Sequence, residues 1–244
     1  MRAAEKSTIA QFLDLAHAYC KGGYRSGERE YQFTDDVPVD TPAAGISMVE
    51  SLERIAEDIQ ACENCQLSKT RKNTVPGEGS NNPLVMVIGE GPGADEDATG
   101  RPFVGRAGQL LDKMLAAIGL SRESNCFIAN VTKCRPPGNR DPQLSETDAC
   151  AAYLNRQIAI LKPRFILSVG RVSAQTLLST GEAIGKLRGK FIDFAVEGRV
   201  IPLIATYHPS ALLRNEELKR PAWEDLKLLR TAITEAGLGE KLLQ

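Results

Sequence analysis

The sequence predicts an α/β domain in which helices cover both faces of a parallel sheet. Between residues 84 and 237, short apolar runs of strand length alternate with longer segments of helical period. The first apolar run leads into a turn at residues 89–105 that contains five glycines and four acidic residues. In sheets of this kind, ligands bind beyond the carboxyl ends of the strands, so we expect the functional residues there.

The composition excludes several classes of protein. The chain has 244 residues, of which 42% are hydrophobic and 25% charged, which is enough to bury a core. The net charge is −1, so any contact with nucleic acid must come from local basic clusters. No apolar run reaches about 18 residues, and the first residues lack the pattern of a signal peptide. We therefore expect a soluble cytoplasmic protein whose cysteines are reduced or bind metal.

Residues 1–46 are predicted to be an extension outside the main domain, which spans 47–244. An apolar helical stripe occupies residues 7–20, and a linker rich in glycine, proline and acidic residues follows at 22–45. A helix is then expected at 47–61, with Ser47 and Glu50 forming a capping box.

Strands and helices alternate through the rest of the chain. Strands are expected at 84–90, 126–131 and 164–170, and a hairpin at 191–209 supplies a fourth long strand. Helices are expected at 107–120, at 145–163 with Ser145 as its cap, at 171–178 and at 220–237.

Four cysteines form a candidate metal site. Cys62 and Cys65 are a C-x2-C pair, and Cys134 and Cys150 lie far downstream. Four thiolates from distant segments can hold a tetrahedral zinc ion or an iron–sulfur cluster, and the spacing does not decide between them. Unligated buried thiols are the alternative, which a C-x2-C pair in an intracellular chain disfavours. The other two cysteines are assigned to the core and to the extension: Cys126 and Cys20.

The glycine-rich turn matches the dinucleotide fingerprint G-x-G-x-x-A in its glycine spacing, but its other residues do not suit a dinucleotide. Pro92 interrupts it, and the acidic run at 95–97 stands where a pyrophosphate needs backbone N–H groups. The glycines instead allow a flat ligand to approach the backbone. The carboxylates suit a reaction that builds positive charge or needs an oriented water.

Three further residues lie at predicted strand ends. Phe103 is either a core residue or a stacking platform for a base. Asn130 either forms a turn or offers a paired donor and acceptor to a base edge. His208 is either structural or catalytic, and the leucines and arginine of the SALLR segment after it resemble an apolar wedge beside a base stack. Basic clusters at KTRKN, KCRPPGNR, KLRGK and LLRNEELKR could contact phosphates.

Together these motifs resemble the family 4 uracil-DNA glycosylases, the bacterial and archaeal iron–sulfur enzymes of base excision repair. The resemblance covers about residues 48–236 and rests on the four cysteines and on the stretches GEGPGADED, GRPFVGRAGQLLD, NVTKCRPPGNRDP and HPSALLR. It implies a three-layer α/β/α fold around a four-stranded, mostly parallel sheet. It also implies a [4Fe–4S] cluster on Cys62, Cys65, Cys134 and Cys150.

The resemblance also implies the roles of individual residues in a uracil site. The site would comprise Gly89, Glu90, Gly91, Phe103, Asn130 and His208. Phe103 would stack on uracil, Asn130 would bind its O4 and N3–H, and His208 would donate to its O2. Relatives whose motif reads GQDPYH hold the attacking water with an aspartate, and Gly91 stands at that position here.

Another acidic residue must therefore hold the attacking water. Glu90 and Glu96 are the candidates, and Glu96 is favoured. Leu212 would fill the gap left in the DNA by the flipped nucleotide.

The function that follows is a monofunctional uracil-DNA glycosylase, acting as a monomer on single- or double-stranded DNA. In a prokaryote it would be associated with the nucleoid. One alternative is a uracil-DNA binding protein without turnover, and another is an iron–sulfur protein that uses the fold for a different role. Related proteins that bind uracil-DNA irreversibly carry a histidine in a basic insertion after the second strand. The corresponding stretch here, CRPPGNRDPQLSE, has none, so turnover is expected.

Overall fold

The computed structural model describes residues 50–196 and 198–243, and every structural statement below refers to these residues. The chain divides into two units, residues 1–47 and 48–244. The helix predicted at 7–20, the linker, Ser47 and Cys20 all lie outside the described residues.

The core of the described unit is a six-stranded sheet with the strand order β1-β3-β2-β4-β6-β5. The inner strands β3, β2, β4 and β6 are parallel, and β1 and β5 pair antiparallel at the two edges. The predicted four-stranded parallel sheet is therefore confirmed as the centre of a wider sheet. The strands are β1 (Glu78–Gly79), β2 (Val85–Gly89), β3 (Cys126–Asn130), β4 (Phe165–Val169), β5 (Phe191–Val196) and β6 (Arg199–Thr206).

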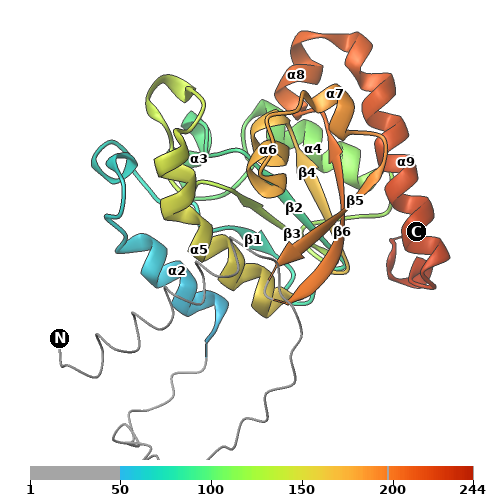
Figure 1. Ribbon diagram of the computed structural model, residues 1–244, viewed down its shortest axis with the longest axis horizontal. Coiled ribbons are helices and arrows are strands. Elements are labelled where there is room, and N and C mark those ends of the chain that lie inside the picture. Colours follow the sequence, from blue (N-terminus) through green and yellow to red (C-terminus); the bar gives the residue numbers. More distant parts are fainter. Residues whose placement is uncertain (1–49, 197, 244) are drawn as a thin grey trace, which may run out of the picture. The chain divides into compact units, whose positions relative to one another are not determined.

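Helices connect the strands and form the outer layers (Figure 1). The α-helices are α2 (Leu52–Gln60), α3 (Ala94–Thr99), α4 (Arg106–Ala116), α5 (Leu144–Leu161), α6 (Arg171–Leu178), α7 (Ile184–Leu187), α8 (Pro209–Arg214) and α9 (Lys219–Glu235). Short 3-10 turns lie at Gln66–Lys69, Pro137–Asn139, Glu216–Leu218 and Gly239–Lys241. No helix in this described part of the chain is both long enough and apolar enough to cross a membrane.

Two helices are capped by residues other than the predicted ones. Ser51 caps α2, since its hydroxyl accepts the backbone N–H of Arg54 at 3.2 Å. The cap of α5 is Gln143 rather than Ser145. The carboxylate of Glu146 accepts the backbone N–H of Gln143 at 2.8 Å, which satisfies a donor that the first helical turn leaves free.

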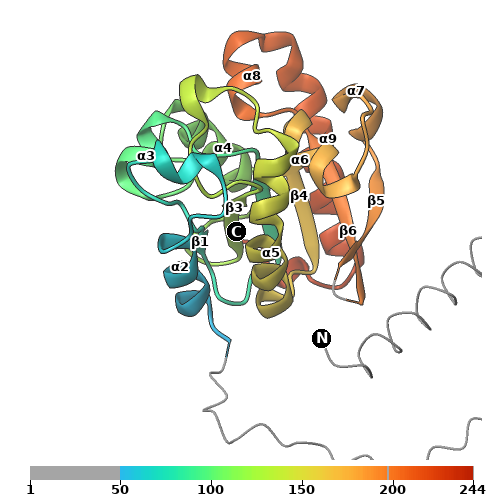
Figure 2. The same ribbon diagram turned by 60° about the vertical axis from the view of Figure 1, so that its left-hand side comes forward.

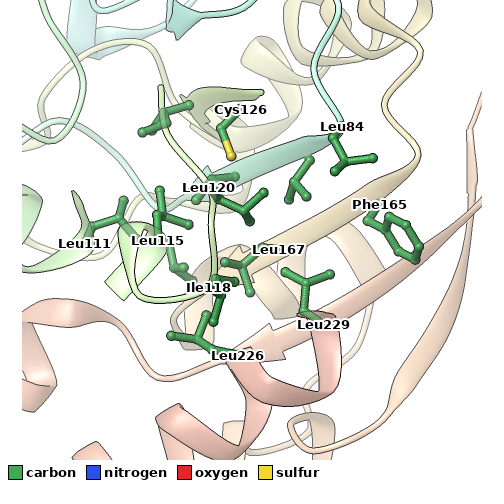
Figure 3. Packing of buried hydrophobic residues seen from close by; sticks show 14 of the residues in the cluster. Leu84, Leu111, Leu115, Ile118, Leu120, Cys126, Phe165, Leu167, Leu226 and Leu229 are labelled. Carbon is green, nitrogen blue, oxygen red and sulfur yellow. The ribbon is translucent and has the colours of Figure 1, made fainter. Parts of the chain in front are cut away.

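Side chains on the two faces of the sheet form separate hydrophobic clusters. On one face, Val85 and Val87 of β2 pack with residues of α4 and α9, and Figure 3 shows Leu226 and Leu229 of α9 turned toward Leu167 of β4. On the other face, the alternate residues of the same strands pack against α5, with α2 and α6 beside it. Every residue of β2, β3 and β4 is buried, as expected for strands covered on both faces. This arrangement is the predicted three-layer α/β/α fold.

The carboxyl ends of the parallel strands all lie at the same end of the sheet. Helices α3, α6 and α8, which follow β2, β4 and β6, gather at that end of the molecule (Figure 2). The glycine-rich turn, Asn130 and His208 therefore lie at the same end.

Candidate active site

A cavity of about 620 Å³ lies at the carboxyl ends of the strands. Its walls come from the loops after β2, β3, β4 and β6 and from the loop before α4. Seven residues singled out from the sequence line it or touch its lining: Gly89, Glu90, Gly91, Glu96, Phe103, Asn130 and His208. Another hollow, of about 680 Å³, lies over α9 and Arg188 and contains none of these residues.

Asn130 carries a buried amide oxygen that has no partner. The residue ends β3 opposite Gly89 and is only 1% exposed. Its Oδ1 atom makes no hydrogen bond within the described residues. An unpaired buried acceptor costs about 1–3 kcal/mol, so this oxygen is suited to a donor supplied by a ligand. Only glycine fits at position 89, because a Cβ atom there would lie 2.4 Å from Oδ1.

Phe103 forms the aromatic wall of the cavity. Its ring centroid lies 5.7 Å from that of His208, and its Cζ atom would lie 2.5 Å from a Cβ atom on Gly89. The backbone of Phe103 has a φ of 52°, a left-handed conformation that is unfavourable for a bulky residue. Such a conformation persists only where the surroundings enforce it, which indicates that the position of this ring matters.

His208 is a neutral hydrogen-bond donor. Its Nδ1 atom accepts the backbone N–H of Ser210 at 3.1 Å, and the Ser210 hydroxyl lies 2.8 Å from the same atom. An amide can only donate, so Nδ1 is unprotonated and the neutral ring carries its proton on Nε2. Burial, helped by the positive charge of Arg214, lowers the pKa of His208 to about 4. At neutral pH the ring therefore donates from Nε2 without being charged.

Glu96 is bound to the backbone of two loops. Its Oε1 accepts the N–H groups of Val104 and Gly105 at 2.8 and 2.9 Å, and its Oε2 accepts the N–H of Gly93 at 3.0 Å. The carboxylate thus joins the turn after β2 to the loop that carries Phe103. Three of its roughly four lone-pair sites are occupied, which weighs against the water-holding role favoured for it.

Glu90 is a partly buried carboxylate of the cavity. It directly follows β2, and within the described part of the chain its side chain makes no hydrogen bond. Its pKa is raised to about 7, chiefly by burial and also by the negative charge of Asp141, against the opposing effect of Arg171. A carboxyl group with a pKa near neutrality is suited to act as a general base.

Asp97, another acid of the glycine-rich turn, is structural. It is 2% exposed and accepts the backbone N–H groups of Lys72 and Asn73 at 2.8 and 3.3 Å. It fastens the segment after the first cysteine pair to α3. Of the four acidic residues in the turn, Glu96 and Asp97 therefore bind backbone N–H groups, while Glu90 and Asp95 line the cavity without such bonds among the described residues.

The four candidate ligand cysteines come together from three parts of the fold. Cys62 and Cys65 follow α2, Cys134 follows β3, and Cys150 lies in α5. Burial raises the pKa values of the Cys134 and Cys150 thiols, Cys65 and Cys62 add to the rise at Cys134, and Cys134 and Cys65 add to the rise at Cys150. Arg71 donates to the sulfur of Cys134 at 3.2 Å.

This sulfur donor set suits an iron–sulfur cluster or zinc. No three His, Cys, Asp or Glu side chains of the described chain are, however, arranged as they would be around a single metal ion. Cys126 is fully buried in the core, as predicted.

Leu212, which is predicted to enter the DNA base stack, does not lie at the surface of the structure. It is 2% exposed, whereas Leu213 is 43% exposed. Pro209 begins α8, and successive residues of a helix are rotated by about 100°, so the two adjacent leucines point in different directions and Leu212 is the one that faces the protein. The exposed leucine beside the cavity loop is Leu213.

The charged residues of the cavity were only partly predictable. Arg140 and Arg214 come from two of the basic clusters seen in the sequence and do line the cavity. Arg171 and Asp141, which pair with each other beside Glu90, were missed. Their signal was position, because Arg171 directly follows the strand end at Gly170. Lys133, in contrast, was assigned to a phosphate-binding cluster but is 1% exposed, and its ammonium binds the backbone oxygen of Asn130 at 3.0 Å.

The fold and the cavity define a class of protein: an α/β/α domain with a cavity at the carboxyl ends of its strands, lined by an aromatic ring, an amide and an imidazole. Comparison with known proteins names the family. The sequence profile of the Uracil DNA glycosylase superfamily matches residues 76–227.

Several characterised relatives are similar over most of the chain. The Type-4 uracil-DNA glycosylase of Saccharolobus solfataricus is 44% identical over 191 residues, which are 76% of this chain and 88% of the relative. That of Pyrobaculum aerophilum is 46% identical over 181 residues, 72% of this chain and 92% of the relative. That of Thermotoga maritima is 42% identical over 191 residues, 77% of this chain and 97% of the relative. This chain belongs to the uracil DNA glycosylase superfamily, which confirms the family inferred from its motifs.

Proposed function

We propose that this protein is a monofunctional uracil-DNA glycosylase that hydrolyses the N-glycosidic bond of deoxyuridine in DNA and leaves an abasic site. The observation that carries the proposal is the unpaired amide oxygen of Asn130, buried in the same cavity as the ring of Phe103 and the imidazole of His208. The Type-4 uracil-DNA glycosylases at 42–46% identity support it. The bond can be reached only when the nucleotide is flipped out of the helix, at a cost of a few kcal/mol.

Recognition of the base rests on the amide of Asn130. Its Oδ1 accepts the N3–H of uracil while its Nδ2 donates to O4, and Phe103 stacks on the ring. Cytosine presents an amine and an unprotonated N3 on the same edge, so both hydrogen bonds would meet the wrong partner. The turn at residues 92–94 lies in the cavity wall and would exclude the methyl group of thymine.

Chemistry at the sugar uses His208 and Glu90. As the glycosidic bond breaks, uracil leaves as an anion and the deoxyribose gains positive charge. The Nε2–H of His208 donates to O2 of the departing base, and the ionised Glu90 stabilises the sugar cation. Water adds to C1′ and gives its proton to Glu90, and the uracil anion takes a proton from solvent. Glu96 keeps the structural role described above.

Basic residues around the cavity mouth contact the DNA backbone. Arg106, Arg140, Arg171 and Arg214 line the cavity and can bind the phosphates that flank the flipped nucleotide. The protein acts as a monomer on single- or double-stranded DNA. Because its substrate is DNA, the protein acts in the cytoplasm of a prokaryote, at the nucleoid.

The decisive experiment for this function is a time course of uracil release from single- and double-stranded oligonucleotides that contain uracil. We expect many molecules of free uracil per molecule of protein, and an abasic strand that stays uncleaved. Release that stops at one uracil per protein would favour the binding protein without turnover. DNA binding that is indifferent to uracil would favour an unrelated role for the fold.

Leu213, rather than Leu212, is proposed to enter the base stack. Leu213→Ala should lower kcat/KM on double-stranded DNA by about tenfold and leave activity on single strands nearly unchanged, because only a duplex has a stack to refill. Its thermal stability should match that of the wild type. Leu212→Ala should instead cost about 2–4 kcal/mol of unfolding free energy, because it leaves a cavity in the core. The opposite pattern in the two variants would indicate that Leu212 is the residue that enters the base stack.

A [4Fe–4S] cluster is proposed on Cys62, Cys65, Cys134 and Cys150, where it would tie the segment after α2 to β3 and α5. The four neighbouring thiols and the positive charge of Arg71 at the Cys134 sulfur support an anionic metal–thiolate group. Protein purified without air should be brown, with broad visible absorption and about four irons per chain. A colourless protein with one zinc per chain would contradict this.

A further inference from the structure

The loop that carries Phe103 is held in an unfavourable conformation from within the protein. Phe103 has a φ of 52°, and its ring is 6% exposed. Gly108, in the first turns of α4, lies directly against it, because a Cβ atom there would lie 2.0 Å from the carbonyl carbon and oxygen of Phe103. Close contact alone does not select this conformation, so its cause lies in the hydrogen bonds to the loop backbone.

Arg122 donates to the backbone on one side of the loop. Its Nη1 donates to the carbonyl oxygen of Pro102 at 2.9 Å, and its Nη2 donates to that of Phe103, also at 2.9 Å. The residue is 8% exposed, lies between α4 and β3, and is not part of the cavity lining. A planar guanidinium is the side chain that can grip two successive carbonyls in this way.

Carboxylates hold the guanidinium in place. Asp112 of α4 accepts from Nε and Nη2 of Arg122 at 3.1 and 2.7 Å. Glu78 of β1 lies 3.5 Å from Nη1 and also binds Arg101, the residue that enters the loop, at 2.6 and 2.7 Å. Arg122 is thus anchored to α4 and to the edge of the sheet.

The other side of the loop is bound by Glu96, which accepts the N–H groups of Val104 and Gly105. The carbonyls at positions 102 and 103 and the N–H groups at 104 and 105 are therefore all paired. With both sides fixed, the backbone of Phe103 has little freedom, and its ring is set against Gly89 and His208 before any ligand enters.

We propose that Arg122 is a positioning residue that holds the aromatic platform of the base site in its binding conformation. The proposal rests on the glycosylase function stated above, in which Phe103 stacks on the flipped uracil. Arg122 touches neither base nor sugar and acts only through Phe103. Arg122 thereby contributes to base binding, because the affinity gained by stacking depends on an aromatic ring that is already in place.

The test is a double-mutant cycle with Arg122→Lys, Phe103→Ala and the two together. Arg122→Lys keeps the charge beside Asp112 but loses the paired donors, and we expect about a tenfold rise in KM with a smaller fall in kcat. Phe103→Ala should lose on the order of tenfold to a hundredfold in kcat/KM, the range that base stacking supplies. In the Phe103→Ala background, Arg122→Lys should change kcat/KM by less than about twofold. Equal losses in both backgrounds would overturn the proposal.

A second measurement does not depend on activity. Hydrogen exchange of the backbone amides of residues 103–108 should speed up in Arg122→Lys and, to a lesser degree, in Asp112→Asn. Arg156→Lys is the matched control, because Arg156 also binds two carboxylates, Glu50 and Asp58, but on the opposite face of the sheet. It should leave these amides unchanged.

Uracil release and hydrogen exchange test the glycosylase function and the positioning role of Arg122 separately. A wild-type protein that releases no uracil would refute the proposed function, while faster exchange in Arg122→Lys would still show that Arg122 holds the loop. Unchanged exchange in Arg122→Lys would refute the positioning role even in a fully active enzyme.

Discussion

Replacing Asn130 by alanine is expected to lower kcat/KM for uracil release by at least about 10³-fold. Sites built to hydrogen-bond a substrate discriminate by this order, because the lost bonds leave polar groups of the bound base unpaired. Asn130 ends β3 next to Gly89, and its amide oxygen has no partner within the described chain, so nothing else in the protein depends on that oxygen. The folded state should therefore lose little stability while catalysis nearly stops.

A buried asparagine elsewhere in the domain supplies the control. Asn125 is 6% exposed, and its amide is fully used: it donates to the carbonyls of Gly119 and Lys241 and accepts the N–H of Ser121. Asn125→Ala should lower the melting temperature and leave kcat/KM unchanged below it. Asn130→Ala should do the reverse. If Asn130→Ala keeps its activity, the base does not bind at this amide.

Asn130→Asp tests the direction of the hydrogen bonds. An ionised aspartate can only accept, so it cannot donate to O4 of uracil, whereas its protonated form can donate to N3 of cytosine and accept from the amine of that base. Uracil release should fall as steeply as in the alanine variant, and slow release of cytosine should become measurable. Product analysis on matched uracil and cytosine oligonucleotides distinguishes the two activities.

The sheet could be predicted from the sequence because its signal is local. Strands β2, β3 and β4 are continuous apolar runs, and the alternation with amphipathic helices dictates a parallel sheet. Strand β1 could not be predicted, since two residues carry no periodicity. The caps at Ser51 and Gln143 were missed because several polar residues precede each helix, and the one that caps is decided by where the chain turns.

The site was predictable as a set of positions rather than as a set of roles. Phe103, Asn130 and His208 meet because parallel strands bring their carboxyl ends together. The free acid could not be chosen between Glu90 and Glu96, because the choice depends on backbone N–H groups eight and nine residues beyond Glu96. The choice between Leu212 and Leu213 depends on the rotational phase of a short helix, which a six-residue pattern does not define.

Glu90→Gln should lower kcat by on the order of 10²–10⁴-fold, the usual contribution of a positioned base. The amide keeps the shape of the side chain but neither takes a proton from water nor stabilises a sugar cation. The wild-type profile of kcat/KM against pH should fall on the acidic side near pH 7, because burial raises the pKa of Glu90 to about 7 and only its ionised form is active. His208, with a pKa of about 4, stays neutral throughout that range and adds no second step.

The raised pKa of Glu90 also predicts how stability depends on pH: stability should fall over the pH range in which activity rises. The folded-state pKa of Glu90 lies above that of an exposed glutamate, so the folded protein binds the proton more tightly than the unfolded chain does. Its stability relative to the variant therefore declines as pH rises from about 4.5 to about 7 and stays low above that. Glu90→Gln carries no charge to bury, so at pH 8 it should unfold at a higher temperature than the wild type, and near pH 4 the two should coincide.

Glu96→Gln is the matched comparison for Glu90→Gln. Its new amide group would face the N–H groups of Val104 and Gly105 or of Gly93, donor against donor, so this variant should lose stability at every pH and show a raised KM. The acid limb of its activity near pH 7 should remain, because Glu90 is still present. A Glu90→Gln enzyme with normal kcat, beside a Glu96→Gln enzyme that folds normally but is inactive, would assign the water to Glu96. Removal of the acid limb by Glu90→Gln alone would assign the water to Glu90.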